Sequence, residues 1–274
     1  MHYSDLAQAI FSRQSYLCVG LDSDYARLPL SVLASENPLL TFNKAIIQAT
    51  QDYCVAYKIN TAFYEALGAQ GWEIMVQTIQ AIPDSHFIIA DAKRGDIGNT
   101  VQQYAKAFFE QLKVDAITVA PYMGADSVLP FLKYENKWVI LLALTSNPSS
   151  RDFQFLQVGP EENTQALYQR VLQTSQSWAG PKQLMYVVGA TQSDHLNTIR
   201  EIIPRHFLLI PGVGQQGGSL EEISRLGLHD QGGLLVNASR SIIFASSGSD
   251  YAAAARKAAQ DLQAEMKIYL EKYT

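Results

Sequence analysis

The chain has 274 residues, of which 47% are hydrophobic and 17% charged. This composition excludes a disordered chain and can bury a sizeable core without a disulfide scaffold. Its 21 basic and 26 acidic residues give a formal net charge of −5. The negative charge and the lack of a Lys/Arg-rich stripe in the sequence argue against a nucleic-acid partner. The length suits one α/β barrel of roughly 250 residues better than two domains.

The first residues, MHYSDLAQAIFSRQ, have neither the basic start nor the apolar core of a signal peptide. The longest aliphatic run, from Val139 to Leu144, is far shorter than the roughly 20 residues that span a bilayer. Cys18 and Cys54 lie in apolar runs with no zinc-ligand spacing, so we expect buried, reduced thiols. These features predict a cytoplasmic protein without a membrane partner.

Eight short apolar runs, rich in β-branched residues, recur along the chain. They are almost continuously hydrophobic, which indicates strands covered on both faces, as in a parallel sheet. The expected strands are 16–21, 54–59, 86–91, 115–120, 138–144, 183–189, 206–210 and 233–237. Segments with helical periodicity lie between or after them, at 42–53, 71–82, 101–112, 164–173, 194–203 and 250–273. Eight alternations favour a single (β/α)8 TIM barrel over residues 1–274, with an open doubly wound sheet as the alternative.

Charged side chains stand at the ends of the first three expected strands. Asp22 follows the first, Lys58 ends the second, and Asp91, Lys93 and Asp96 end or follow the third. In a barrel these strand ends meet at the mouth, and buried charges need partners. The cluster is either an ion-pair network that only closes the barrel or a functional site. In a functional site the ammonium groups would attract an anion, and the carboxylates would repel a substrate carboxylate.

The longest irregular stretch, from Thr145 to Asn163, follows the fifth expected strand. Loops of this length are usually functional or disordered, and barrels carry their chemistry on loops that follow strands. We therefore expect a lid or a substrate contact here, with a surface insertion as the alternative.

Residues Pro211 to Gly218, with the sequence PGVGQQGG, follow the seventh expected strand. Glycines let backbone amides approach a phosphate, and a helix expected to begin near Gly218 adds an N-terminal anion site. The same letters contain G-x-G-x-x-G, but a dinucleotide fingerprint opens its domain, so nicotinamide binding is disfavoured. Arg240, after the last strand in VNASRSI, stands where barrels often bind phosphate, although a solvated Arg is the alternative.

The segment DAKRGDIGNT from Asp91 to Thr100, together with Lys58, PGVGQQGG and SRSI, resembles the orotidine 5′-phosphate decarboxylase family. The likeness is to its longer bacterial branch, type 2, and extends over essentially the whole chain. It implies a (β/α)8 barrel that converts orotidine 5′-phosphate to uridine 5′-phosphate, the last step of de novo UMP biosynthesis, without metal or organic cofactor. One departure is Gly98, which stands where shorter members have proline.

The resemblance also implies a catalytic tetrad. Lys93 resembles the proton donor to C6 of the substrate, and Asp91 would lie against the departing carboxylate. Lys58 would hold Asp91 and contact the ribose. Asp96 would complete the tetrad from the partner subunit of a homodimer, and Thr100 would come with it.

The same resemblance implies five substrate-binding positions besides Thr100. Asp22 resembles a ribose contact, and Ser146 resembles the residue that binds the edge of the pyrimidine. Gln216 and Arg240 resemble the pair that holds the phosphate, with the backbone of Ser239 assisting. Two rivals stay open: a magnesium-dependent sugar-phosphate enzyme of the same superfamily, whose carboxylates would bind the metal, and a non-catalytic phosphate-binding barrel.

Overall fold

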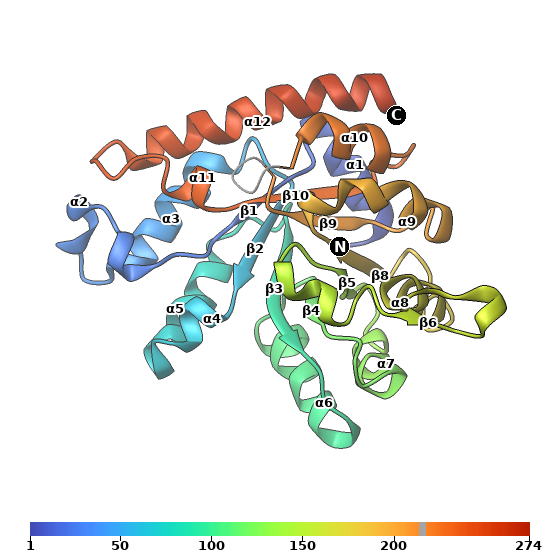
Figure 1. The fold of residues 1–274 in the computed structure, drawn as a ribbon. Coiled ribbons are helices and arrows are strands. Elements are labelled where there is room, and N and C mark those ends of the chain that lie inside the picture. The colour runs from blue at the N-terminus through green and yellow to red at the C-terminus, as the bar shows by residue number, and fades with distance from the viewer. Residues whose placement is uncertain (214–217) are drawn as a thin grey trace.

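Eight parallel strands close into a barrel in the computed structural model, which describes residues 1–213 and 218–274 (Figure 1). The strands are β1 (Leu17–Gly20), β2 (Ala56–Asn60), β3 (Phe87–Arg94), β4 (Ala116–Val119), β5 (Trp138–Leu144), β8 (Leu184–Val188), β9 (Leu208–Pro211) and β10 (Leu234–Ala238). Each pairs with its neighbours in chain order, and β10 returns to β1 through the pair Leu17 and Val236. The closed barrel is confirmed, and the open sheet is excluded.

The barrel strands are buried on both faces, as the continuous apolar runs predict. Every residue of β1, β4, β8 and β10 is buried, because one face fills the barrel and the other packs against helices. Aromatic rings fill the amino-terminal end of the barrel. Trp138 lies edge-on to Phe87 and Phe207, with ring centroids 5.8 and 6.3 Å apart. This packing closes the end opposite the charged strand termini.

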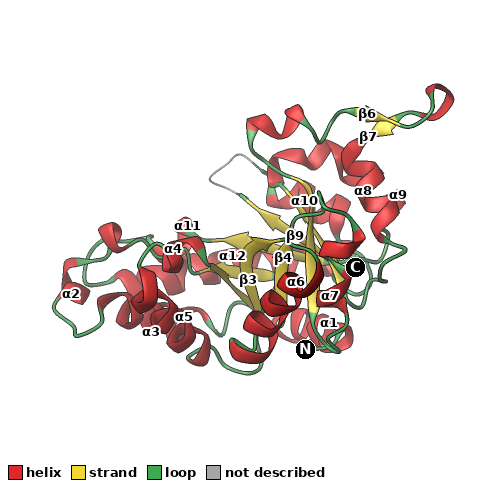
Figure 2. Ribbon diagram, turned by 90° about the horizontal axis from the view of Figure 1, so that it is seen from below, coloured by secondary structure: helices red, strands yellow, loops and turns green. Residues whose placement is uncertain are grey.

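Helices surround the barrel (Figure 2). The longer ones are α1 (Tyr3–Arg13), α3 (Pro38–Thr50), α5 (Gly68–Gln80), α6 (Gly98–Ala105), α8 (Leu167–Ser175), α9 (Leu196–Ile202), α10 (Leu220–Gly227) and α12 (Tyr251–Tyr273). The shorter ones are α2 (Leu30–Leu33), α4 (Ala62–Glu65), α7 (Leu129–Leu132) and α11 (Arg240–Ile243). All six expected helices are present. The one expected at 101–112 is α6 together with a π-helical turn, Lys106–Gln111.

Two helix boundaries show how local sequence decides the structure. Helix α10 begins where the Gly-rich segment predicts, because Ser219 caps it by accepting a hydrogen bond from the backbone N–H of Glu222. Helix α8 begins three residues later than expected, since Gln165–Ala166 form strand β7. Helix α1 was not expected, although its buried residues Leu6 and Ile10 have helical spacing.

The stretch from Thr145 to Asn163 is folded. It contains the 3-10 turns Pro148–Asp152 and Glu161–Asn163 and the strand β6 (Gln157–Val158), which pairs with β7 in a hairpin that projects from the barrel (Figure 2). The Gln154 side chain holds the start of this stretch: it accepts a hydrogen bond from Thr145 N and donates one to Thr145 Oγ1, both of 2.8 Å.

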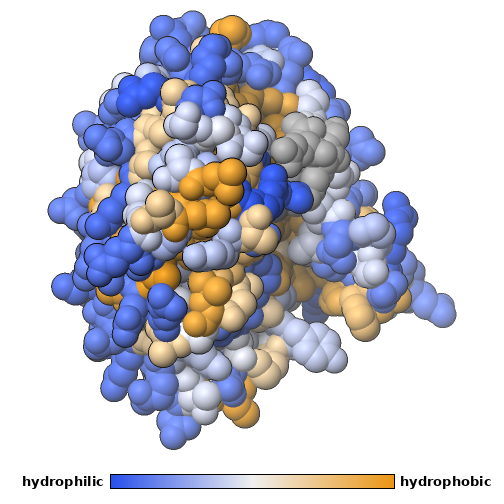
Figure 3. Space-filling view, turned by 90° about the vertical axis from the view of Figure 1, so that its left-hand side faces the viewer, coloured by the Kyte–Doolittle hydropathy of each residue, from blue (hydrophilic) through white to orange (hydrophobic). Residues whose placement is uncertain are grey.

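The outer surface mixes hydrophilic and hydrophobic residues on the side that carries α2 (Figure 3). Leu30 and Leu33 of α2 are among the exposed apolar side chains. Among the described helices, none is long and apolar enough to cross a bilayer. Cys18 and Cys54 are free and buried, as expected, and burial raises the pKa of both thiols.

Candidate active site

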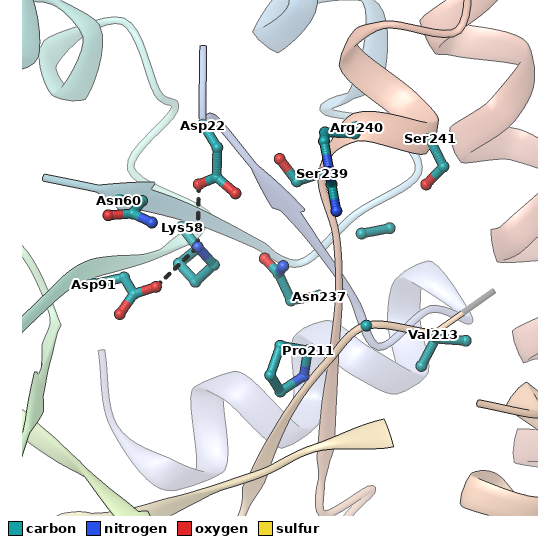
Figure 4. A pocket seen from close by; sticks show the side chains of 12 residues that line it. Asp22, Lys58, Asn60, Asp91, Pro211, Val213, Asn237, Ser239, Arg240 and Ser241 are labelled. Atoms are coloured by element: carbon teal, nitrogen blue, oxygen red, sulfur yellow. Dashed lines mark hydrogen bonds and ion pairs between the residues drawn. The ribbon is translucent and has the colours of Figure 1, made fainter. Parts of the chain in front are cut away.

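The charged residues at the ends of β1, β2 and β3 meet at the carboxyl-terminal mouth of the barrel (Figure 4). Lys58 Nζ lies 3.2 Å from Asp22 Oδ1 and 3.1 Å from Asp91 Oδ2. Lys93 Nζ lies 2.6 Å from the other oxygen of Asp91. Carboxylate and ammonium therefore alternate in one continuous chain, in the order Asp22, Lys58, Asp91, Lys93.

Mutual pairing fixes the charge of the two central groups. Lys58 is only 4% exposed, and burial works to lower its pKa, but Asp22 and Asp91 raise the pKa above its usual value. Burial likewise works to raise the pKa of Asp91, but Lys58 and Lys93 outweigh it and lower that pKa to about 2. At neutral pH Lys58 is therefore an ammonium and Asp91 a carboxylate.

Lys93 sits on a β-bulge. Its φ is +48°, in the left-handed region that residues with a side chain rarely adopt. The pairing of β3 with β4 is regular as far as Ala90 and resumes at Arg94, so the bulge lies between them. Thr118 of β4 holds the irregular backbone, because its Oγ1 accepts a 2.8 Å hydrogen bond from Lys93 N. The same Oγ1 donates to Asp91 Oδ1 at 3.0 Å, so one hydroxyl ties the bulge to the carboxylate.

Arg94 anchors the end of the bulge. Its guanidinium donates to Ala92 O at 3.0 Å, across Lys93, and forms an ion pair with Glu65 of α4. The same group lies 5.5 Å from the ring centroid of Tyr104. Since α4 follows β2, this contact links the strand that carries Lys58 to the strand that carries Lys93.

A buried polar network positions the loop that carries Asp22. Asn43, which is fully buried, accepts a 2.6 Å hydrogen bond from Ser23 and donates one of 3.0 Å to the Tyr64 hydroxyl. That hydroxyl donates to Leu21 O at 3.1 Å. The residues on both sides of Asp22 are thus held by hydrogen bonds within the core.

Two cavities meet at the charged cluster and share Lys58, Asp91 and Pro211. One, of about 190 Å³, is mostly polar, and its other lining residues include Asp22, Asn60, Gly212, Asn237, Ser239 and Arg240. The second, of about 230 Å³, has an apolar floor, and its other lining residues include Lys93, Thr118, Leu142, Ser146, Val187 and Leu209. Together they fit a ligand with an anionic, polar end and a flat part with apolar faces.

Four of the expected binding residues, Asp22, Ser146, Ser239 and Arg240, line these two cavities. Ser146 lies in the second cavity, and Ser239 and Arg240 lie in the first. Ser239 Oγ donates to Gly20 O at 3.1 Å, which ties the end of β10 to the end of β1. Gln216 lies outside the described residues.

Asp96 and Thr100 do not line either cavity. Asp96 Oδ1 accepts a 2.8 Å hydrogen bond from Ile97 N, and Thr100 is exposed in α6. Gly98, between them, has φ +61°. Proline, with φ fixed near about −65°, is incompatible with this turn, so proline could not replace Gly98 in this backbone conformation.

Among the cavity-lining residues that were not selected from the sequence are three uncharged polar residues of the barrel strands: Asn60, Thr118 and Asn237. Each lies close to the carboxyl end of its strand, and in β2 the only other polar side chains are those of Tyr57 and Lys58. That pattern could have identified them as candidate site residues, because a polar side chain in a buried strand needs a hydrogen-bond partner.

Comparisons with known proteins agree with this geometry. The profile of the Orotidine 5'-phosphate decarboxylase / HUMPS family matches residues 15–258. The orotidine 5'-phosphate decarboxylase of Parabacteroides distasonis is 54% identical over 98% of this chain and 96% of its own. That of Bacteroides fragilis is 52% identical over 99% of both chains. The solved OMP decarboxylase of Leishmania donovani superposes with a TM-score of 0.83 at 36% identity, covering 98% of this chain and 99% of its own.

Proposed function

The chain belongs to the orotidine 5′-phosphate decarboxylase / HUMPS family, and we propose that it converts orotidine 5′-phosphate to uridine 5′-phosphate and carbon dioxide, the last step of de novo UMP biosynthesis. We also propose that residues 1–274 form one domain and that the protein works in the cytoplasm. The alternating chain Asp22, Lys58, Asp91, Lys93 carries the proposal.

The two cavities suit the two halves of this substrate. The 5′-phosphate would bind beside Arg240 and the Ser239 backbone, with Gln216, which lies outside the described residues, as a further contact. The ribose would lie near Asp22 and Lys58. The pyrimidine would lie on the apolar floor of the second cavity with Ser146 at its edge. In this arrangement the substrate carboxylate points at Asp91.

Asp91 would drive the reaction by repulsion. With a pKa of about 2 it remains charged beside the substrate carboxylate. Two unit charges at ~4 Å and an effective dielectric of about 20 repel by ~4 kcal/mol, and departure of neutral carbon dioxide relieves that repulsion. Because each 1.36 kcal/mol is roughly tenfold in rate, this interaction can contribute substantially.

Lys93 would supply the proton. As the bond between C6 and the carboxyl carbon breaks, its electron pair stays on C6, where the Lys93 ammonium stabilises it and transfers a proton to it. Lys58 is less suited, because two carboxylates hold its proton and raise its pKa. Lys93 contacts one carboxylate and is 51% exposed, so it can recover a proton from water.

No metal or organic cofactor is needed for this chemistry. The developing charge at C6 is stabilised by a fixed ammonium in place of a metal ion. Each oxygen of Asp91 already has an ammonium partner, which disfavours the magnesium-dependent alternative.

We also propose a homodimer in which Asp96 and Thr100 reach the site of the partner subunit. Exposed apolar side chains lie near these residues, and such groups mark interaction surfaces. Ile97 is 57% exposed, and Tyr122, in the loop after β4, is 93% exposed. Met123 is 47% exposed and lies next to Gly95 of the same motif. A second copy of this chain would cover these residues and bring a carboxylate to the ribose.

One assay tests the activity: loss of orotidine 5′-phosphate absorbance with purified protein dialysed against EDTA. We expect turnover that magnesium does not increase. Turnover that requires added magnesium supports the metal-dependent alternative. Nucleotide binding without turnover supports the non-catalytic barrel and overturns the proposal.

A further inference from the structure

Asn237 is a nearly buried amide whose oxygen has no protein partner. It lies in β10, is 8% exposed, and precedes the phosphate-side residues Ser239 and Arg240. Within the described residues, its Oδ1 accepts no hydrogen bond. A buried polar group without a partner is unfavourable, and native structures contain few of them. A packing role alone would be better served by an apolar residue such as its neighbours Leu235 and Val236.

The surroundings keep this amide free for a ligand. The facing residue of β9 is Pro211, which has no backbone N–H to donate. On the β1 side Cys18 is the residue in register with Asn237, and a Cβ at Gly20, further along the strand, would lie 3.1 Å from Asn237 Oδ1 and 2.7 Å from Ser239 Cβ. The backbone of β1 therefore approaches closely without supplying a side-chain donor. Figure 4 shows the amide reaching into the polar cavity.

The position of Asn237 within the cavity determines which part of a bound nucleotide this residue can contact. Lys58 and the charged cluster lie on one side of it, and Arg240 lies on the other (Figure 4). A nucleotide that spans these two ends has its ribose in the middle. A phosphate dianion offers only acceptors, whereas ribose hydroxyls are donors that can satisfy a carbonyl oxygen.

Oδ1 has almost no accessible surface, and neither it nor Nδ2 has a hydrogen bond among the described residues, so nothing prevents the amide from turning about χ2. We propose that Asn237 binds the sugar of the nucleotide in the turned orientation, with Oδ1 facing the cavity and accepting a hydrogen bond from a ribose hydroxyl. The inference rests on the proposed function and adds a residue to the sugar-binding part of that site. It makes Asn237 a specificity residue, because a sugar that lacks the bonded hydroxyl leaves a buried oxygen unpaired. The site then favours ribonucleotides over the corresponding deoxyribonucleotides.

The test combines protein variants with altered sugars. Asn237→Leu keeps the side-chain volume and removes the amide, and calorimetry gives Kd values for uridine 5′-phosphate and its 2′-deoxy and 3′-deoxy analogues. The wild-type protein should bind at least one deoxy analogue about tenfold more weakly than uridine 5′-phosphate. Asn237→Leu should weaken uridine 5′-phosphate about tenfold and bind that analogue no more weakly than the wild type does.

Equal weakening of all three nucleotides by Asn237→Leu overturns the sugar contact, as does no weakening at all. If Asn237→Leu does not fold, Asn237→Ala replaces it. The wild-type measurements also test the proposal without any variant, since equal affinity of the wild-type protein for the three nucleotides overturns it. Failure of the wild-type protein to bind uridine 5′-phosphate contradicts the proposed function instead, so the two failures are distinguishable.

Discussion

The Thr118 hydroxyl donates a 3.0 Å hydrogen bond to Asp91 Oδ1. It also accepts one of 2.8 Å from the backbone N–H of Lys93, so it contacts the Asp91 carboxylate and the backbone of Lys93, the two residues to which we assign the chemistry. Thr118 is 1% exposed and touches the ligand cavity only at its wall. It is therefore a positioning residue, which acts by holding the carboxylate and the bulge in one geometry.

Thr118→Val keeps the shape of the side chain and removes both hydrogen bonds. A hydrogen bond to a charged group contributes about 1.5–3 kcal/mol, so kcat should fall about 10–100-fold. The Kd for uridine 5′-phosphate should change far less. Steady-state kinetics and calorimetry measure the two effects, and Thr118→Ser, which retains the hydroxyl, should restore most of kcat. A Thr118→Ser variant as slow as Thr118→Val contradicts the positioning role.

Lys93→Ala tests the proton donor. Turnover should fall by at least about 10³-fold, because both the proton and the charge that stabilises C6 are lost. Product binding should stay measurable, since Lys58 still neutralises Asp91 in the remaining cluster. Near-normal turnover in this variant rules out Lys93 as the donor.

Arg240→Ala tests the phosphate site. Loss of a charge-assisted contact, at about 2–3 kcal/mol, should weaken uridine 5′-phosphate about 30–100-fold. Uridine, which lacks the phosphate, should bind Arg240→Ala and wild-type protein equally. A similar loss for nucleotide and nucleoside would show that Arg240 acts elsewhere in the site.

The eight strands and the charges at their ends could be predicted, because continuous apolar runs ending in Asp or Lys are local patterns. The bulge at Lys93 could not. The sequence suggested that Asp91 and Lys93 share a face of an extended strand, whereas Lys93 has a left-handed backbone held by Thr118 from the next strand. Such a conformation depends on tertiary contacts between residues 25 positions apart.

Part of the proposed site could not be assigned from residue patterns. Asp96 and Thr100 were identified only by resemblance, and neither lines either of the two cavities at the charged cluster. Asn237 was overlooked because one Asn in an apolar strand resembles a core residue until its unpaired oxygen is located. Periodicity finds buried strands but does not distinguish a buried polar side chain with a partner from one that lacks it.

Mixing two inactive variants tests the shared site. Lys93→Ala supplies an intact Asp96, and Asp96→Ala supplies an intact Lys93, so a mixed dimer contains one site with both residues. With random exchange about a quarter of wild-type activity should return, because half the dimers are mixed and each has one intact site. Activity of the re-equilibrated mixture, compared with each variant alone, measures this. If the subunits exchange but the mixture regains no activity, Asp96 does not contribute to the site across the interface.

Acid should destabilise the fold through two histidines near the amino-terminal end of the barrel. Burial, with Arg200 close by, lowers the pKa of His206 and His229 to about 4. Both ring nitrogens of His206 lack hydrogen-bond partners among the described residues. The positive charge of Arg200 would repel a protonated His206 or His229. Backbone carbonyls, including those of Gly227 and Gly233, accept hydrogen bonds from the Arg200 guanidinium and hold it in place.

The neutral histidines stabilise the fold fully above the unfolded pKa of about 6.5, and this contribution declines as pH falls towards 4. Between pH 7 and pH 5 the loss should be on the order of 2 kcal/mol for each histidine. Asp91, with a pKa of about 2, loses its contribution only below about pH 4, so it does not obscure this window. Urea unfolding at both pH values measures the change. His206→Phe keeps a ring and cannot be protonated, so it should reduce the pH dependence, and an unchanged dependence would show that His206 is not responsible.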